Sequence, residues 1–189
     1  MAVDSSSMGD PARYRTLGEL EQGLKAIPPA PADDGRVTLI VSRGEGGTRN
    51  TPGCVTVTPE TGMPGDAWGR SPGRNPEMQL AVIQRDVATL IANGQPLTLF
   101  GDNLILDLDL SAGSLPPGSR LRAGTALLEV TPMPHNGCRK FNARFGNDAL
   151  RFASGNELRH RNLRGIYMRA VESGEIGVGD AVKVVSRPA

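Results

Sequence analysis

The segment Pro134-His135-Asn136-Gly137-Cys138-Arg139-Lys140-Phe141 sets a thiol beside an imidazole and two fixed positive charges. A cysteine reacts as its thiolate, and neighbouring cations favour that charged form. Cys138 is therefore a candidate nucleophile, and His135 could accept its proton or orient the thiol. The alternatives are an inert, buried cysteine and a histidine that is exposed or held by structural hydrogen bonds, since free cysteines are among the most buried residue types.

Positive charge is concentrated directly after Cys138, although the formal net charge of the whole chain is only +1. The basic residues between 139 and 169 are Arg139, Lys140, Arg144, Arg151, Arg159, Arg161, Arg164 and Arg169, against Asp148 and Glu157 as acidic ones. This imbalance indicates an anionic small molecule nearby, or else a solvated helix face. No nucleic-acid partner is expected, because the chain lacks zinc-finger spacing, an aromatic-rich strand motif and a strongly basic overall charge.

Other residues of chemical interest form weaker patterns. The loop 43–49 is rich in glycine and could cradle a phosphate, but it lacks the GxxxxGK[ST] spacing and is better explained as a flexible strand connection. The sequence has no CxxC or HxxxH pair for zinc, and Ser154-Gly155 lies in an ordinary loop that gives no support for serine hydrolase chemistry. Asp107 and Asp109 alternate with leucines, as solvated side chains of a strand do. Cys54 lies in an apolar run and is expected in the core.

The elements that position Cys138 are predicted to be short and mostly extended. Glycine (24 residues) and proline (15 residues) are frequent, which is typical of a turn-rich β-protein. Apolar runs predict strands at 37–41, 54–58, 80–83, 104–110, 120–122, 126–130, 165–171 and 181–185. Helical spacing predicts helices at 14–27, 85–92 and 141–150. Cys138 thus falls between a strand ending at Thr131 and the start of a helix, where the helix dipole adds to the effect of the cations.

Together these elements predict a mainly β chain with short helices, arranged as a barrel rather than as a doubly wound sheet. The expected organisation is a disordered tail at 1–12, an N-terminal helix and linker at 13–35, and one barrel domain at 36–186. The chain has neither a secretory signal nor an apolar run long enough for a membrane span, which predicts a cytoplasmic protein with no membrane partner. In that compartment both cysteines are expected as thiols.

Several segments, in order along the chain, resemble the MOSC domain, the module named for the C-terminal part of molybdenum cofactor sulfurases. The segments are Gly62-Met63-Pro64-Gly65-Asp66, Phe100-Gly101-Asp102-Asn103-Leu104, the strand pair 121–131, Cys138, Gly165-Ile166-Tyr167 and Gly179-Asp180-Ala181-Val182. The resemblance depends on their order and spacing over residues 37–185, because no segment is specific alone. The chain departs from the family pattern at Asn136-Gly137, where many members have a proline next to the cysteine, and at Asp102, which replaces the usual glutamate.

The resemblance implies a MOSC-type barrel of the pyruvate-kinase-barrel kind and a role in molybdenum cofactor metabolism. Cys138 would carry sulfur as a persulfide in a sulfurtransferase-like reaction, with a cysteine desulfurase or a molybdoenzyme as partner. Alternatively, Cys138 would ligate the metal of a bound molybdenum cofactor (molybdopterin) in an oxidoreductase module, or the chain would be a non-catalytic binder of a phosphorylated small molecule. Arg139, Lys140 and Arg144 are assigned to the anion and Asn103 to the pocket. Pyridoxal phosphate is not expected, because the chain has no room for a desulfurase domain.

Overall fold

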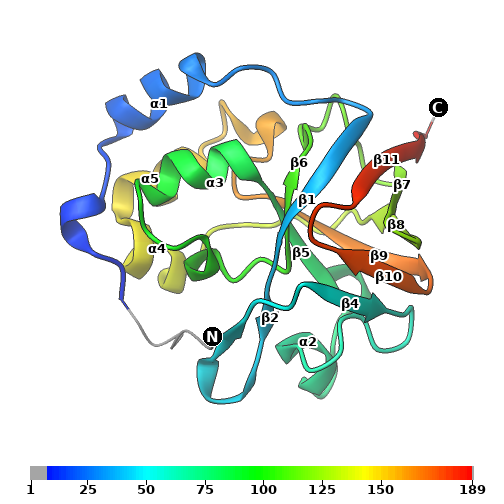
Figure 1. Cartoon of the computed structure of the whole chain (residues 1–189). Helices are drawn as coiled ribbons and strands as arrows, with labels where there is room; N and C mark the ends of the chain where they lie inside the picture. The colour runs from blue at the N-terminus through cyan, green and yellow to red at the C-terminus, as the bar shows by residue number, and fades with distance from the viewer. Residues whose placement is uncertain (1–7, 189) are drawn as a thin grey trace.

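In residues 8–188, which the computed structural model describes, seven strands close into a barrel in the order β1-β11-β7-β8-β9-β5-β6 (Figure 1). The barrel strands are β1 (Asp34–Ile40), β5 (Leu80–Gln84), β6 (Leu104–Asp107), β7 (Arg120–Ala123), β8 (Ala126–Val130), β9 (Ile166–Glu172) and β11 (Ala181–Ser186). Two further pairs form separate two-stranded sheets: β2 (Ser42–Arg43) with β3 (Arg49–Asn50), and β4 (Cys54–Val57) with β10 (Gly174–Gly177). The prediction of a mainly β barrel with short helices is confirmed.

One pair of neighbouring barrel strands is parallel, and its connection leads to the site described below. β5 runs parallel to β6, with Val82 opposite Leu104, whereas the other neighbours are antiparallel. Parallel strands need a crossover connection, and α3 (Arg85–Ala92) and the 3-10 turn η4 (Leu97–Phe100) supply it on the outside of the barrel. The crossover brings residues 101–103 to the start of β6, where the Asn103 N–H donates to the carbonyl oxygen of Ala81 at 2.6 Å.

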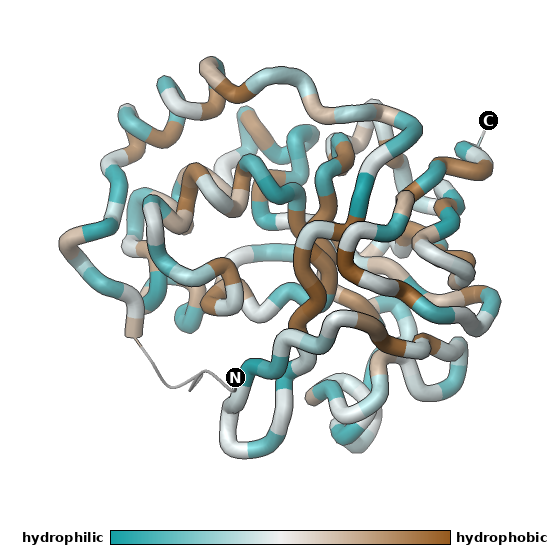
Figure 2. Tube along the Cα trace, in the orientation of Figure 1, coloured by the Kyte–Doolittle hydropathy of each residue, from teal (hydrophilic) through white to brown (hydrophobic). Residues whose placement is uncertain are grey.

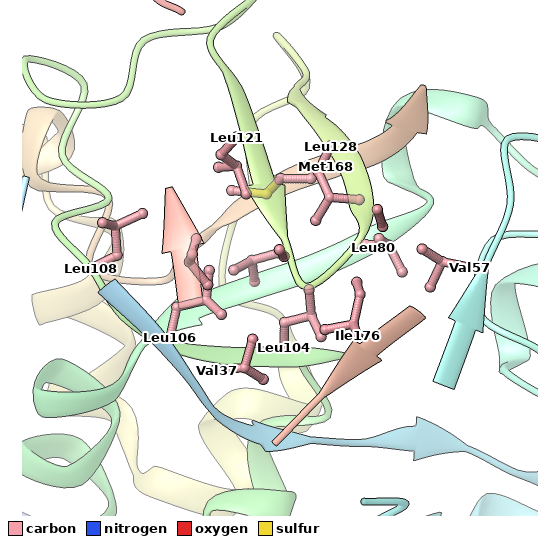
Figure 3. Packing of buried hydrophobic residues seen from close by; sticks show 14 of the residues in the cluster. Val37, Val57, Leu80, Leu104, Leu106, Leu108, Leu121, Leu128, Met168 and Ile176 are labelled. Atoms are coloured by element: carbon pink, nitrogen blue, oxygen red, sulfur yellow. The ribbon is translucent and has the colours of Figure 1, made fainter. Parts of the chain in front are cut away.

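The barrel interior is filled by aliphatic side chains that alternate along each strand (Figure 3). Leu104 and Leu106 of β6 point into this core, while Ile105 between them packs against the helices, as the two-residue period of a strand requires. The strand expected at 104–110 ends at Asp107, and its outward-facing Ile105 is buried rather than exposed, but the predicted alternation holds at 106–110, where the leucines are buried and the two aspartates are partly exposed. Both faces of β6 are buried because α3 covers the outer one.

Four of the five α-helices in residues 8–188 cover one side of the barrel and form a second core there (Figure 1). They are α1 (Leu17–Ala26), α3, α4 (Arg139–Phe145) and α5 (Asn147–Ser154). α1 begins with a capping box in which Thr16 accepts from the Glu19 N–H and the Glu19 carboxylate accepts from the Thr16 N–H. Figure 2 shows its hydrophobic residues at helical intervals, with hydrophilic residues between them. No helix within residues 8–188 is long and apolar enough to span a bilayer.

The helix predicted at 141–150 is divided in two by Gly146. This residue has φ 87 and ψ 166, which ends α4 and starts α5 in a new direction. A side chain at this positive φ would be strained, and it would also meet the ring of Tyr14. Tyr14 in turn donates from its hydroxyl to the carbonyl oxygen of Ala143 at 2.8 Å. The break thus lets the N-terminal segment pack onto α4.

Two other expectations differ from the structure. Cys54 is exposed on β4 rather than buried, because β4 pairs with β10 outside the barrel and its inward-facing residue is Val57. Of the predicted tail at 1–12, residues 1–7 lie outside the described residues. The structure places a 3-10 turn at Pro11–Arg13, and the Gly9 N–H donates to Ala143.

Candidate functional site

A cavity of about 750 Å³ opens between the β2–β3 hairpin, the turn after η4 and the N-terminal half of α4. Its wall is made of Met8, Arg43, Gly44, Gly47, Arg49, Ala67, Ala81, Phe100, Gly101, His135, Asn136, Cys138, Lys140, Phe141, Ala143, Arg144, Arg164 and Tyr167. Elements far apart in the sequence therefore meet around Cys138, and the size of the cavity is typical of a small-molecule site.

The charged side chains on this wall are all basic among the residues that the structure describes. They are Arg43, Arg49, Lys140, Arg144 and Arg164. The carboxylates that approach the cavity, Asp66 and Asp102, lie behind two of these arginines and are 1% exposed. An anionic ligand would thus meet guanidinium and ammonium groups without facing a carboxylate, which is the arrangement that recognises phosphate.

Arg43 is fixed in the wall by a buried polar network centred on Asp66. The Asp66 carboxylate accepts from Arg43 Nη2 at 2.6 Å, from Arg43 Nε at 3.0 Å and from the Arg43 backbone N–H at 2.8 Å. It also accepts from the Trp68 N–H at 2.9 Å, as N-cap of α2 (Ala67–Arg70), and from Asn103 Nδ2 at 2.9 Å. Burial alone would raise the pKa of Asp66, but the hydrogen bonds and charge of Arg43 lower it below its ordinary value. The carboxylate is ionised and holds Arg43 in one orientation.

Arg164 is held by Asp102, with His135 beside both, and here burial outweighs the charge and hydrogen bond of Arg164 and raises the pKa of Asp102 above its ordinary value. Arg164 Nη1 donates to Asp102 Oδ2 at 2.8 Å, and His135 Nδ1 lies 3.5 Å from Asp102 Oδ1. The His135 ring packs on Tyr167 with ring centroids 4.2 Å apart, and its side chain is 5% exposed. Burial, followed by the charges of Arg164 and Arg43, holds the pKa of His135 well below its ordinary value. The imidazole is consequently neutral near pH 7. It acts as a hydrogen-bonding group and adds no positive charge to the cavity wall.

Three polar atoms in this second cluster are buried without a hydrogen-bond partner among residues 8–188. They are Asp102 Oδ1, His135 Nδ1 and Arg164 Nε. Asp102 Oδ1 and His135 Nδ1 face each other at 3.5 Å and can satisfy one another through a small shift or a shared water, so Arg164 Nε is the atom left for a water or ligand. His135 and Arg164 both line the cavity, and both are more than nine-tenths buried.

Arg49 and Arg144 form a like-charged pair across the cavity. Burial, followed by repulsion from Arg144 and Arg43, lowers the pKa of Arg49, whose Nε has no hydrogen-bond partner among the described residues. Gly101, at φ 73, leaves room for the Arg49 guanidinium, because a Cβ there would lie 3.2 Å from Arg49 Nη2. Arg144 Nη1 donates to the carbonyl oxygen of Leu99 at 2.7 Å. Such proximity of like charges is unfavourable by itself and is relieved by an anion between them.

Cys138 lies on the wall of this cavity as the N-cap residue of α4, with its side chain exposed and making no capping hydrogen bond. Burial lowers the pKa of Arg144, and the charge of a Cys138 thiolate opposes that shift, which places the two side chains within electrostatic reach of each other. Arg144 and Lys140, both on α4, therefore line the same wall as the Cys138 thiol.

The structure brings most of the predicted site residues together. Cys138, His135, Lys140 and Arg144 line one cavity, whereas Arg139 is exposed and is not part of its wall. Asn103 is wrong as a wall residue: it is fully buried beneath the cavity, where its amide donates to Val41 and Asp66 and accepts from the Ala81 N–H. An amide side chain fits that place because the buried Val41 carbonyl and the Ala81 N–H each need a hydrogen-bond partner.

Sequence reasoning missed Arg43, Arg49 and Arg164 as cavity residues. The first two flank the glycine-rich loop 43–49, which we expected to be a strand connection, and the structure shows that this loop also lines the cavity. The pairing of Arg43 with Asp66 spans 23 positions, and that of Arg164 with Asp102 spans 62. Two sequence features could have indicated these cavity residues: an arginine at each end of a glycine-rich loop, and the aspartates of the segments 62–66 and 100–104.

Comparison with known proteins agrees with this fold. The MOSC domain family model matches residues 75–183, which is more than half of the chain and includes Cys138, Lys140, Arg144 and Arg164. Among solved structures, the YuaD protein from Bacillus subtilis is similar with a TM-score of 0.62 and 16% sequence identity, over 82% of this chain and 97% of that chain. YiiM from Escherichia coli is similar with a TM-score of 0.54 and 22% identity, over 82% and 71% of the two chains.

YiiM from Geobacillus stearothermophilus is also similar, with a TM-score of 0.56 and 20% identity over 81% of this chain and 76% of that chain. At these identities the likeness shows the fold alone. No curated protein matches the sequence significantly. The matched residues, the closed barrel and the thiol on its cation-lined cavity together lead to one assignment: the chain belongs to the MOSC domain family.

Proposed function

We propose that this protein is a sulfur carrier that accepts a sulfur atom on Cys138 and passes it to an anionic acceptor bound in the cavity. The observation that carries the proposal is an exposed thiol on the wall of a cavity whose charged residues, within the described chain, are all basic. A thiol alone would be a weak argument, but Arg164 adds a buried Nε without a hydrogen-bond partner among residues 8–188 on the same wall. This atom supports a polar ligand in the cavity.

The proposed reaction has two steps that conserve atoms and electrons. The Cys138 thiolate attacks the outer sulfur of a donor persulfide, R–S–SH, so that a new S–S bond forms while the S–S bond of the donor breaks and R–S⁻ leaves. A nucleophilic atom of the acceptor then attacks the outer sulfur of the Cys138 persulfide, and the Cys138 thiolate is released with its electron pair. No external oxidant or reductant is needed. The expected donor is the persulfide of a cysteine desulfurase.

The charges of the wall fit these steps. Arg144 and Lys140 lie on the same wall as Cys138, while Arg43, Arg49 and Arg164 would hold the anion of the acceptor. His135 is neutral, because burial and then Arg164 and Arg43 keep its pKa low. Its role is therefore to hydrogen-bond the thiol or the transferred S–H group rather than to store a proton. A molybdoenzyme would be the protein that uses the product.

The acceptor in this family context is the molybdenum cofactor, and the cavity fits such a group in two respects. The basic wall suits its phosphate, and the half-buried ring of Tyr167 on the same wall offers an apolar contact to a planar ring system, whereas Phe100 and Phe141 are 5% and 2% exposed and belong to the helix-side core. When bound, the cofactor would supply a molybdenum centre that takes up sulfur, and in its reduced state this centre would provide the electron pair for the transfer. Residues 8–188 contain no cluster of three His, Cys, Asp or Glu side chains that could hold a metal ion, so any metal would have to bring most of its own ligands.

Persulfide formation on Cys138 is tested by intact-mass analysis. The purified protein is incubated with a cysteine desulfurase and cysteine, and the mass of one additional sulfur atom is expected. Cys138→Ser should abolish the added mass, and Cys54→Ser, which removes the other exposed thiol, should leave it. Added sulfur that persists in Cys138→Ser, or that disappears in Cys54→Ser, would refute the carrier role of Cys138.

The alternative of Cys138 as a molybdenum ligand needs a separate measurement. Protein produced in a host that makes the cofactor is purified and its molybdenum content is determined. Stoichiometric molybdenum that is lost in Cys138→Ser would favour ligation over sulfur carriage. Molybdenum that is retained in Cys138→Ser would place the cofactor in the cavity without a bond to this thiol.

A further inference from the structure

Three exposed cations surround the segment 134–138 that carries the thiol. Arg139 and Lys140 follow Cys138 in α4, and Arg159 lies in the 3-10 turn η5 (Arg159–Arg161). None of them takes part in an ion pair within residues 8–188. We call Arg139, Lys140 and Arg159 the cationic rim.

Arg159 is far from Arg139 and Lys140 in sequence but lies close to the 134–138 segment in the fold. Pro134, His135, Asn136 and Arg159 line one small cavity of about 60 Å³, and His135 and Asn136 also line the main cavity. Gly137 lies so close to Leu150 and Ser154 of α5 that a side chain at this position would clash with them. Arg139 and Lys140 therefore follow the thiol directly in the chain, and Arg159 lies beside Asn136, two residues before it.

Exposed arginines on the β7–β8–β9 face are arranged differently. Arg120 and Arg169 both bind Glu129, at 2.9 and 2.6 Å, and Arg122 binds Glu172 at 3.0 Å. These cross-strand pairs offset much of the positive charge of that face. The acidic residues nearest the rim in sequence point elsewhere, since Asp148 pairs with Arg151 and Glu157 lines a separate groove. Other exposed cations of residues 8–188 also lack an ion pair, namely Lys25, Arg36, Arg70, Arg74 and Arg161, so the rim is distinguished by its place beside the thiol.

We infer that the cationic rim docks an acidic surface of the protein that delivers sulfur to Cys138. This inference rests on the proposed sulfur-carrier function, which requires a donor to bring its persulfide against an exposed thiol. Unpaired surface charges do little for folding, but they steer a partner of opposite charge and orient it during association. An acidic patch beside the donor persulfide would meet Arg139, Lys140 and Arg159 as its sulfur reaches Cys138.

A protein partner fits the surface better than a nucleic acid does. Single-stranded nucleic acids bind where bases stack on exposed aromatic rings, and the large exposed hydrophobic side chains of residues 8–188 are Met8, Met78, Val178 and Val185, with no aromatic ring among them. Persulfide chemistry also requires that the partner present sulfur, which a protein cysteine does.

The probe for this inference is a pair of synthetic peptide persulfides, one rich in glutamate and one rich in serine, each ending in a cysteine persulfide. Sulfur transfer to the protein is followed by intact mass under second-order conditions. The acidic peptide should react about tenfold faster at low ionic strength, and this advantage should fall towards unity near 1 M salt, where the Debye length is about 3 Å. The ratio of the two rates is the readout, because it cancels any change in the thiol itself.

Charge reversal separates the rim from the cavity. Arg159→Glu, alone and with Arg139→Glu, should reduce or invert the rate ratio, and neither residue lines the main cavity. Lys25→Glu, at the far end of α1, is the matched control and should leave the ratio unchanged. A ratio near unity in the wild-type protein, a ratio unaffected by the rim variants, or stronger competition by a single-stranded oligonucleotide than by the sulfur-free acidic peptide would overturn the inference. Failure of both peptides and of free cysteine persulfide to modify Cys138 would instead refute the carrier function.

Discussion

Replacing Asp66 by asparagine tests whether the buried network beneath the cavity holds Arg43 in place. The change keeps the shape of the side chain but removes the charge that receives three donors of Arg43, together with those of Trp68 and Asn103. The new amide nitrogen also directs a donor at groups that are themselves donors. Removing one partner of a buried ion pair costs about 3–5 kcal/mol. Arg43 keeps 25% of its side-chain surface exposed, so we expect the lower end, about 3 kcal/mol.

For a chain of this size, that loss corresponds to a decrease in Tm of about 6–12 °C. The assay is urea and thermal unfolding of the wild type and Asp66→Asn at pH 7. Asp34→Asn is the matched control, because Asp34 pairs with Lys183 at 3.8 Å on the surface and both side chains are largely exposed. We expect that control to change the unfolding free energy by less than about 0.5 kcal/mol.

The pH dependence gives a second, independent readout. The Arg43 interactions lower the pKa of folded Asp66, against the effect of burial. The carboxylate therefore contributes stability that is complete above its unfolded pKa near 3.9 and is lost as the pH falls through the lower folded value. The difference between wild type and Asp66→Asn should be constant from pH 8 to about pH 5 and should shrink below about pH 4.

A double-mutant cycle with Arg43→Gln isolates the pair. If the network acts as a unit, the double variant should lose much less unfolding free energy than the two single variants lose in sum. A loss below about 1 kcal/mol in Asp66→Asn, or strictly additive effects with Arg43→Gln, would show that Asp66 does not hold the arginine.

Three further outcomes are expected. Thr16→Ala removes the capping box of α1 and should cost about 1 kcal/mol in urea unfolding, without changing persulfide formation; an unchanged midpoint would mean that the cap contributes nothing. Gly35→Ala would press a methyl group onto the carbonyl oxygen of Asp107 across the β1–β6 pair, and should destabilise the barrel by about 1–3 kcal/mol or more. Gly18→Ala adds a methyl group in open space within α1, and should stabilise the protein by about 0.5–1 kcal/mol. Both thiols are exposed, so Cys54 and Cys138 should both react with a thiol reagent in the native protein, and protection of Cys54 until unfolding would contradict its place on β4.

Much of the fold could be predicted because its signals are local. The hairpin of β7 and β8, the extent of α3 and the left-handed cap at Asn93 follow from short apolar runs and turn residues that act within a few positions. The pairing of strands is not local. β1 closes the barrel against β6 and β11, far along the chain, and β4 pairs with β10 outside it. Strand propensity does not distinguish these partners, which is why Cys54 was expected in the core.

The same distinction applies to the site. The sequence by itself determined that a thiol would stand beside cations at the start of a helix, because Cys138, Arg139 and Lys140 are consecutive and their order needs no folding to be known. Only the tertiary structure decided which charges face the ligand. Barrel closure brings Arg43 and Arg49 to the cavity, fixes Arg43 and Arg164 on buried Asp66 and Asp102, and turns Arg139 outward. Burying a carboxylate requires a partner, and in this fold the partners come from distant positions that only the closed barrel brings together.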